Sequence, residues 1–161
     1  MKYIFLDIDG VLNSQEYLLS DRGRCTHTLD ESRVRLLAKI VHETEAAIVL
    51  SSSWRIGWTR CVATKGDSYT LALRQLFNKY GIVVVGCTQI NGAGSRKEEI
   101  YNYVTNYLQK YDSWVAIDDE DLQIPEPRFV KTSFYEGKGL EEFHLPAIRH
   151  ALDITIEEEW N

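Results

Sequence analysis

Two acidic side chains near the amino terminus have the type and spacing for chemistry. Asp7 and Asp9 follow a short apolar run over residues 3–6 and precede Gly10. Their i, i+2 spacing can place both carboxylates toward one site. An Asp-Gly pair is also a common turn former, so the motif alone fits either an acidic site or a turn.

A second pair of acids favours the acidic site. Asp118 and Asp119 follow another apolar run, over residues 114–117. If both runs are strands of one parallel sheet, the acids that follow them meet at the edge where such sheets bind ligands. Carboxylates crowded there repel each other unless a cation lies among them. Because oxygen ligands without a histidine or cysteine cluster favour Mg²⁺ over zinc, the sequence predicts a magnesium site at Asp7, Asp9, Asp118 and Asp119.

The elements that must position these acids alternate along the chain. Apolar runs predict strands, and amphipathic patterns with capping signals predict helices. The alternation predicts an α/β fold, a Rossmann-like three-layer sandwich with a mostly parallel sheet and helices on both faces. The expected strands cover residues 3–6, 46–50, 82–85, 114–117 and 129–130. The expected helices cover residues 28–41, 71–80, 95–108 and 140–152, and the last of them is interrupted or started near Pro146.

Between these elements we expect loops and no further domain. The segments that end at His27 and that cover residues 54–67 are polar or contain glycine, and Glu157–Glu159 is expected to be a solvated charge run. Neither of the first two segments is long enough for a sizeable cap domain over the site. With 161 residues, the chain is expected to form a single domain over residues 1–161 with an open site.

Composition limits the classes of partner. The net charge is −6 and the pI is about 5.2, so the chain has no general attraction for nucleic acid or anionic lipid. The three cysteines have no metal-site spacing, which favours free thiols in a reducing compartment. The apolar stretch before Asp7 is too short for a signal peptide, and no segment is long enough to span a bilayer. We therefore expect a cytoplasmic protein without a membrane partner, whose oligomeric state the sequence does not predict.

Phosphoryl transfer suits this set of groups. A carboxylate nucleophile divides hydrolysis into formation and breakdown of an aspartyl-phosphate. Mg²⁺ offsets the repulsion between two anions, and a second carboxyl can protonate the leaving oxygen and later activate water. The candidate phosphate-binding groups are the backbone N–H groups of Gly10 and Val11, the hydroxyls of Ser51 and Ser52, the guanidinium of Arg55, and either Arg96 or Lys97 at a helix start.

Three of these segments resemble the motifs of the haloacid dehalogenase (HAD) superfamily. Residues 7–12 resemble motif one (DxDGV/T), residues 48–51 resemble motif two, and residues 114–119 resemble motif four, an apolar run that ends in paired acids. Motif three is a lone basic residue, which Arg96 and Lys97 both match. The resemblance covers most of the chain in the right order, and motif one is its most specific part.

The resemblance implies a role for each acid. Asp7 would be the nucleophile and a metal ligand, and Asp9 would supply the acid/base carboxyl and a metal-binding backbone carbonyl. Ser51 would bind phosphate, and Asp118 or Asp119 would complete the Mg²⁺ shell. Superfamily members with an acid at the position of Asp9 are typically phosphatases or phosphomutases. The wider pattern is similar to small HAD domains of Swiss army knife RNA-repair proteins.

The expected substrate is a nucleotide or the terminal phosphate of a short nucleic acid. Trp54, Trp58 and Tyr69 lie near the predicted open site and could stack on a base, although packing on the loop is the commoner role for such residues. Sugar phosphates, phosphoproteins and a non-catalytic binding role are the alternatives. A response-regulator receiver domain is less consistent with the sequence, because the third strand ends in Gly86 and Cys87 instead of an aspartate.

Overall fold

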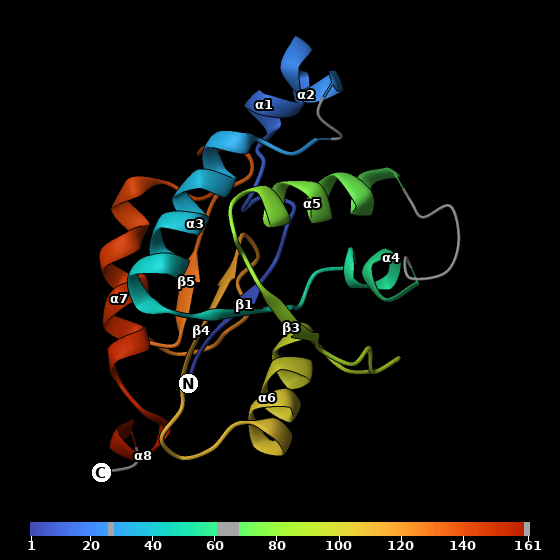
Figure 1. The fold of residues 1–161 in the computed structure, drawn as a ribbon. Helices are drawn as coiled ribbons and strands as arrows, with labels where there is room; N and C mark the ends of the chain where they lie inside the picture. Colours follow the sequence, from blue (N-terminus) through green and yellow to red (C-terminus); the bar gives the residue numbers. More distant parts are fainter. Residues whose placement is uncertain (26–27, 61–67, 160–161) are drawn as a thin grey trace.

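The computed structural model describes residues 1–25, 28–60 and 68–159 (Figure 1). Its centre is a five-stranded sheet in the order β3-β2-β1-β4-β5, whose described strands all pair in parallel. This arrangement confirms the predicted α/β fold. The strands are β1 (Lys2–Leu6), β2 (Ala47–Leu50), β3 (Val84–Cys87), β4 (Ser113–Asp118) and β5 (Phe129–Lys131).

Helical segments lie in the connections from β1 to β2, from β2 to β3 and from β3 to β4, and others follow β5, whereas residues 119–128 join β4 to β5 without a helix. Four of the helical segments are long enough to cover the sheet, and the others are one or two turns in length. The four long helices are α3 (Glu31–Thr44), α5 (Ser68–Lys79), α6 (Arg96–Tyr107) and α7 (Leu145–Asp153). The short ones are α1 (Gln15–Leu19), α2 (Asp21–Cys25), α4 (Arg55–Arg60), η1 (Glu142–His144) and α8 (Ile156–Glu159).

The helices form one layer on each face of the sheet. Ile4 and Leu6 of β1 are buried in a core that includes apolar residues of α3, α5 and α7. Phe5 belongs to a second core, in which residues of α6 and Ile156 of α8 pack on the opposite face. Figure 1 shows α5 and α6 on opposite sides of the strands between them. The central strands are buried on both faces, which explains their uninterrupted apolar sequences.

The register of the sheet aligns the carboxyl ends of the three strands that carry predicted site residues. Leu6, the last residue of β1, pairs with the last residue of β2 and with the penultimate residue of β4. Asp7, Ser51 and Asp118 come next along these three strands and therefore lie at the same edge of the sheet. The described part of the chain has no sizeable cap domain over this edge, as predicted.

Several local predictions were wrong. Residues 55–60 form α4 within a segment expected to be a loop, because Trp54 and Trp58 pack against the core and this contact outweighs the glycine at position 57. Two short helices, α1 and α2, occupy the polar segment before α3. The third strand begins two residues later than expected. The last helix starts at Leu145 with Pro146 in its first turn, in agreement with the expected start near Pro146. Residues 61–67 of the expected loop lie outside the described residues.

The acidic tail is not simply solvated. Glu159 forms an ion pair of 2.9 Å with Arg128, whose side chain is 1% exposed. The same guanidinium also donates to the carbonyl oxygens of Trp114 and Ala151, so it joins β4 to α7.

Within residues 1–25, 28–60 and 68–159, no helix combines the length and the apolarity that a membrane crossing needs.

Candidate active site

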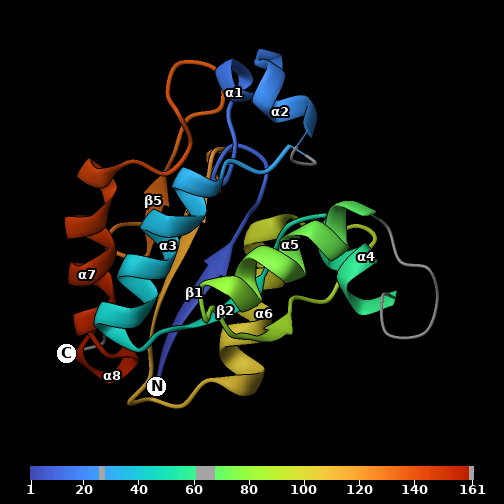
Figure 2. The ribbon, with the colours of Figure 1, turned by 45° about the horizontal axis from the view of Figure 1, so that its top comes forward.

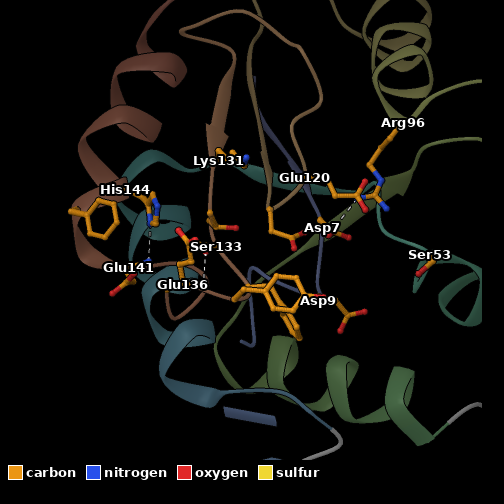
Figure 3. Close-up of a pocket in the computed structure, with 16 residues that line it drawn as sticks. Asp7, Asp9, Ser53, Arg96, Glu120, Lys131, Ser133, Glu136, Glu141 and His144 are labelled. Atoms are coloured by element: carbon orange, nitrogen blue, oxygen red, sulfur yellow. Dashed lines mark hydrogen bonds and ion pairs between the residues drawn. The ribbon is translucent and has the colours of Figure 1, made fainter. Parts of the chain in front are cut away.

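An open cavity of about 1120 Å³ lies at the carboxyl edge of the sheet. Figure 3 shows Asp7 and Arg96 on one side of this cavity and His144 and Glu141 on the other. Three parts of the chain supply most of its lining: the end of β1, the segment after β4, and the segment from Lys131 to His144. Three of the four predicted acids, Asp7, Asp9 and Asp119, therefore share one cavity with the wall formed by residues 131–144, which sequence reasoning missed.

Three carboxylates converge at the base of the site. One oxygen from each of Asp7, Asp118 and Asp119 lies within 4.8 Å of the others. Asp7 and Asp118 are 5% and 1% exposed. Burial, followed by the negative charge of Asp118, raises the pKa of Asp7 to about 7. Burial likewise raises the pKa values of Asp118 and Asp119. A divalent cation would relieve this crowding, and the all-oxygen ligand set fits Mg²⁺.

Arg96 provides the positive charge next to these acids. Its Nη1 lies 2.6 Å from Oδ2 of Asp118 and 3.4 Å from Oδ2 of Asp7. A capping box of Ser95 and Glu98 starts α6 at this residue, at the edge of the sheet that holds the acids. Lys97 instead donates to the carbonyl oxygen of Gln123 at 2.7 Å. Of the two candidate basic residues, the structure therefore brings only Arg96 to the carboxylates.

Gly10 allows the second acidic pair to approach the first. Its φ is +81°, and a Cβ built on it would lie 2.3 Å from Cγ of Asp119. Its N–H donates to Oδ1 of Asn13 at 2.8 Å, and the N–H of Val11 donates to the carbonyl oxygen of Ile8 at 3.1 Å. The expectation that these two N–H groups cradle the phosphate is not met in this conformation, because both already have partners within the turn.

Asp9 lies at the exposed rim, separate from the cluster of three acids. Asn13 donates to its Oδ1 and the indole N–H of Trp54 donates to its Oδ2, each at 2.9 Å. Both carboxylate oxygens of Asp9 therefore accept a hydrogen bond from a neighbouring side chain. Sequence reasoning missed this role of Asn13. A signal was present, because an Asn side chain four residues after Asp9 can reach back across a turn.

The two predicted serines differ in what they contact. Both are 1% exposed. The Ser52 hydroxyl hydrogen-bonds the carboxylate of Asp7, an interaction that opposes the rise in the pKa of Asp7. The N–H of Ser51 donates to the carbonyl oxygen of Leu6 at 3.1 Å, which ties the end of β2 to β1. Ser53, which was not predicted, lines the cavity.

Arg55 does not face the site. Its Nη2 lies 2.7 Å from Oε2 of Glu99 on α6, and the two side chains are 8% and 6% exposed. Its Nη1 donates to the carbonyl oxygens of Ser51 and Ser52. The structure thus makes this guanidinium an internal brace, in place of the predicted phosphate ligand. Glu99 lies 44 positions away in sequence, so the pairing has no local signal.

The aromatic residues predicted to stack on a base already make contacts within the protein. The Trp58 ring has the guanidinium carbon of Arg74 at 3.8 Å from its centroid and Phe77 at 6.2 Å. The Trp54 ring meets Tyr69 edge to face at 6.0 Å, while its N–H binds Asp9. These contacts support the packing role for both tryptophans.

The wall after β5 is tied directly to the loop after β1. The Thr132 hydroxyl donates to the carbonyl oxygen of Gly10 at 2.6 Å. The N–H of Leu140 donates to the carbonyl oxygen of Val11 at 2.8 Å. The N–H of Gln15 donates to the carbonyl oxygen of Phe134 at 2.9 Å. Figure 2 shows the segment that follows β5 beside α1 at the top of the molecule. Sequence reasoning missed the wall, because only the strand order places it beside β1 and β4.

The sheet order and the acids after β1 and β4 define a HAD-like α/β protein. A family model described as the HAD domain in Swiss Army Knife RNA repair proteins matches residues 3–143. The chain belongs to this family, which confirms the resemblance seen in the motifs. No match was found among curated proteins.

Proposed function

We propose that the protein is a Mg²⁺-dependent phosphomonoester hydrolase that acts through an aspartyl-phosphate on a nucleotide or on the terminal phosphate of a nucleic acid. Membership in the HAD family implies hydrolase or phosphatase activity in general. The observation that carries the finer proposal is the buried cluster of Asp7, Asp118 and Asp119 with Arg96 beside it. The RNA-repair description of the family supports the substrate class.

The first half of the proposed reaction forms the intermediate. A carboxylate oxygen of Asp7 attacks phosphorus, and the bond between phosphorus and the leaving oxygen breaks. Asp9 gives its proton to that leaving oxygen, so the product departs as an alcohol. The donors Asn13 and Trp54 then stabilise the negative charge left on Asp9.

The second half restores the enzyme. A water molecule attacks phosphorus, and Asp9 takes a proton from this water. The bond between phosphorus and Asp7 breaks, which releases phosphate and returns both carboxyl groups to their starting states. Arg96 offsets negative charge on the transferred group throughout, because its guanidinium already lies 3.4 Å from Asp7.

The same residues fit the metal. Asp7, Asp118 and Asp119, with the backbone carbonyl of Asp9, would hold Mg²⁺, which would stabilise charge on the phosphoryl oxygens. Ser51 and Ser52 lie beside this cluster at the end of β2, and we assign them to orienting Asp7 and the phosphate. Lys97 and Arg55 have no part in the proposed mechanism, because their cationic groups bind elsewhere.

A substrate screen tests this function. Purified protein would be assayed with Mg²⁺ against nucleotides, terminally phosphorylated oligonucleotides, sugar phosphates and phosphopeptides, and each assay would be repeated with EDTA. We expect Mg²⁺-dependent release of phosphate, fastest from a nucleotide or an oligonucleotide end, and none from the Asp7→Asn variant. Asp153→Asn is the control, because this exposed carboxylate pairs with Lys2 far from the site.

Each result of the screen has a defined meaning. Activity of Asp7→Asn at the wild-type rate would refute the nucleophile, and full activity after chelation would refute the metal. Faster cleavage of sugar phosphates or phosphopeptides than of every nucleotide would replace the substrate assignment. Phosphate release by no substrate in the screen would favour a non-catalytic role.

A further inference from the structure

The cavity extends well beyond the three carboxylates that would hold the phosphate. Its far wall, residues 131–144, carries aromatic side chains that the proposed reaction does not use. Tyr135 and Phe143 line the cavity and are 74% and 71% exposed, and Phe134 lines it beside Tyr135 at 4.9 Å between ring centroids. Large apolar side chains left open beside a reactive centre mark a binding surface.

The wall is held at a fixed position relative to the nucleophile. Besides the bonds from Thr132 and Leu140 to the loop after β1, Gly139 approaches that loop closely. Its φ is +73°, and a Cβ on it would lie 2.5 Å from the carbonyl oxygen of Val11. The aromatic side chains are therefore presented by a segment packed directly on the loop that follows Asp7, as a preorganised site requires.

The charges around the wall limit what can bind there. Glu120, Glu136 and Glu141 line the cavity, and the main cation on the phosphate side, Arg96, already contacts two acids. Lys131 lines the same cavity, and no ion pair is formed by its amine within the described residues. A leaving group with several negative charges would be repelled, whereas a flat neutral group with at most one further phosphate would be accepted.

We propose that Phe134, Tyr135 and Phe143 form a leaving-group subsite that stacks the terminal nucleoside of a phosphomonoester substrate. This inference rests on the proposed function, since it places the reacting phosphate at Asp7. Two sources share this chemistry, a free mononucleotide and the end of a short oligonucleotide. If the substrate is an oligonucleotide end, the amine of Lys131 is the cation that would bind the next phosphodiester group.

Binding to the Asp7→Asn variant tests the subsite without turnover. In the presence of Mg²⁺, calorimetry would compare a nucleoside monophosphate with glycerol phosphate, which has no ring. We expect the nucleotide to bind more tightly, and the added substitutions Tyr135→Ala and Phe143→Ala to reduce this preference about tenfold or more, given the usual worth of stacking one base on aromatic side chains. Tyr111→Ala is the matched control, because this 66% exposed ring lies beside Met1 at the opposite edge of the sheet.

The outcomes separate this inference from the proposed function. Equal affinity for the two ligands, or a preference that the double substitution leaves unchanged, overturns the subsite even if wild-type protein is an active phosphatase. Retained preference for nucleotides by a wild-type protein that hydrolyses nothing overturns the proposed function and supports the subsite. Tighter binding of a phosphorylated dinucleotide than of the mononucleotide, weakened by Lys131→Met, identifies a nucleic-acid end as the source. The reverse order identifies a free nucleotide.

Discussion

Arg55 and Glu99 form a buried ion pair of 2.7 Å that joins the first residue of α4 to helix α6. The same guanidinium binds the carbonyl oxygens of Ser51 and Ser52, and Oε1 of Glu99 accepts the N–H of Asn91 at 3.0 Å. The pair therefore fixes the serine loop relative to the helix that presents Arg96.

Removal of one partner of this pair should destabilise the protein strongly. Glu99→Gln leaves the Arg55 charge buried without a counter-ion, which typically costs about 3–5 kcal/mol. Urea denaturation would measure the loss in the free energy of unfolding. Glu43→Gln is the control, because the Arg149–Glu43 pair is 38% and 39% exposed and should contribute roughly 0–1 kcal/mol. Similar losses in the two variants would contradict the bracing role.

Trp54 should act on catalysis through Asp9. Trp54→Phe keeps an aromatic ring against Tyr69 but removes the donor to Oδ2 of Asp9. A lost hydrogen bond to a charged group is worth about 1.5–3 kcal/mol, so kcat should fall roughly tenfold or more with little change in KM.

The leaving group distinguishes this role from a structural one. The decrease should be larger for an alkyl phosphate, whose leaving oxygen needs a proton, than for 4-nitrophenyl phosphate, whose leaving group does not. Trp58→Phe, which changes the neighbouring indole away from Asp9, should keep the wild-type ratio of these two rates. An equal decrease for both substrates in Trp54→Phe would count against the role.

Gly10→Ala should weaken metal binding. The new Cβ would collide with the Asp119 carboxyl, and alanine at a φ of +81° adds strain of about 1–2 kcal/mol. We expect the Mg²⁺ concentration for half-maximal activity to rise about tenfold. Gly92→Ala is the matched control, because a Cβ there meets nothing within 4 Å. An unchanged Mg²⁺ response in Gly10→Ala would show that Asp119 is not a ligand.

The sequence could predict the sheet and its acidic edge because both have local signals. Strands buried on two faces are uninterrupted apolar runs, and the parallel register then brings Asp7, Ser51 and Asp118 together. The choice between Arg96 and Lys97 had no such signal. Adjacent residues on a helix point about 100° apart, and only the packing of α6 decides which one faces the site.

Other parts of the site depend on contacts between distant segments. Arg55 matched a phosphate ligand by position, but its partner Glu99 lies on another element. The aromatic wall enters the site because β5 pairs with β4, and the hydrophobic pattern does not specify this strand order. Trp54 was expected near the site for its ring, whereas its N–H makes the contact with Asp9.

The last prediction concerns pH and the metal. The pKa of Asp7 is raised from 3.8 to about 7, so the folded protein holds a proton there that the unfolded chain loses near pH 4. This protonation stabilises the fold below pH 4, and the contribution is lost as the pH rises through 7. With EDTA present, the free energy of unfolding should therefore fall between pH 5 and pH 8 by on the order of 3 kcal/mol through Asp7.

Two comparisons check this assignment. Asp7→Asn cannot titrate, so its stability in EDTA should fall much less over the same range and should exceed that of the wild type at pH 8. Added Mg²⁺ should restore the wild type at pH 8, because a bound cation replaces the missing proton, and it should affect Asp7→Asn much less. Thermal unfolding of both proteins at the two pH values, with and without Mg²⁺, provides the measurement. Parallel pH profiles in EDTA would show that Asp7 is already ionised in the folded protein, and that its carboxylate does not depend on the metal for charge compensation.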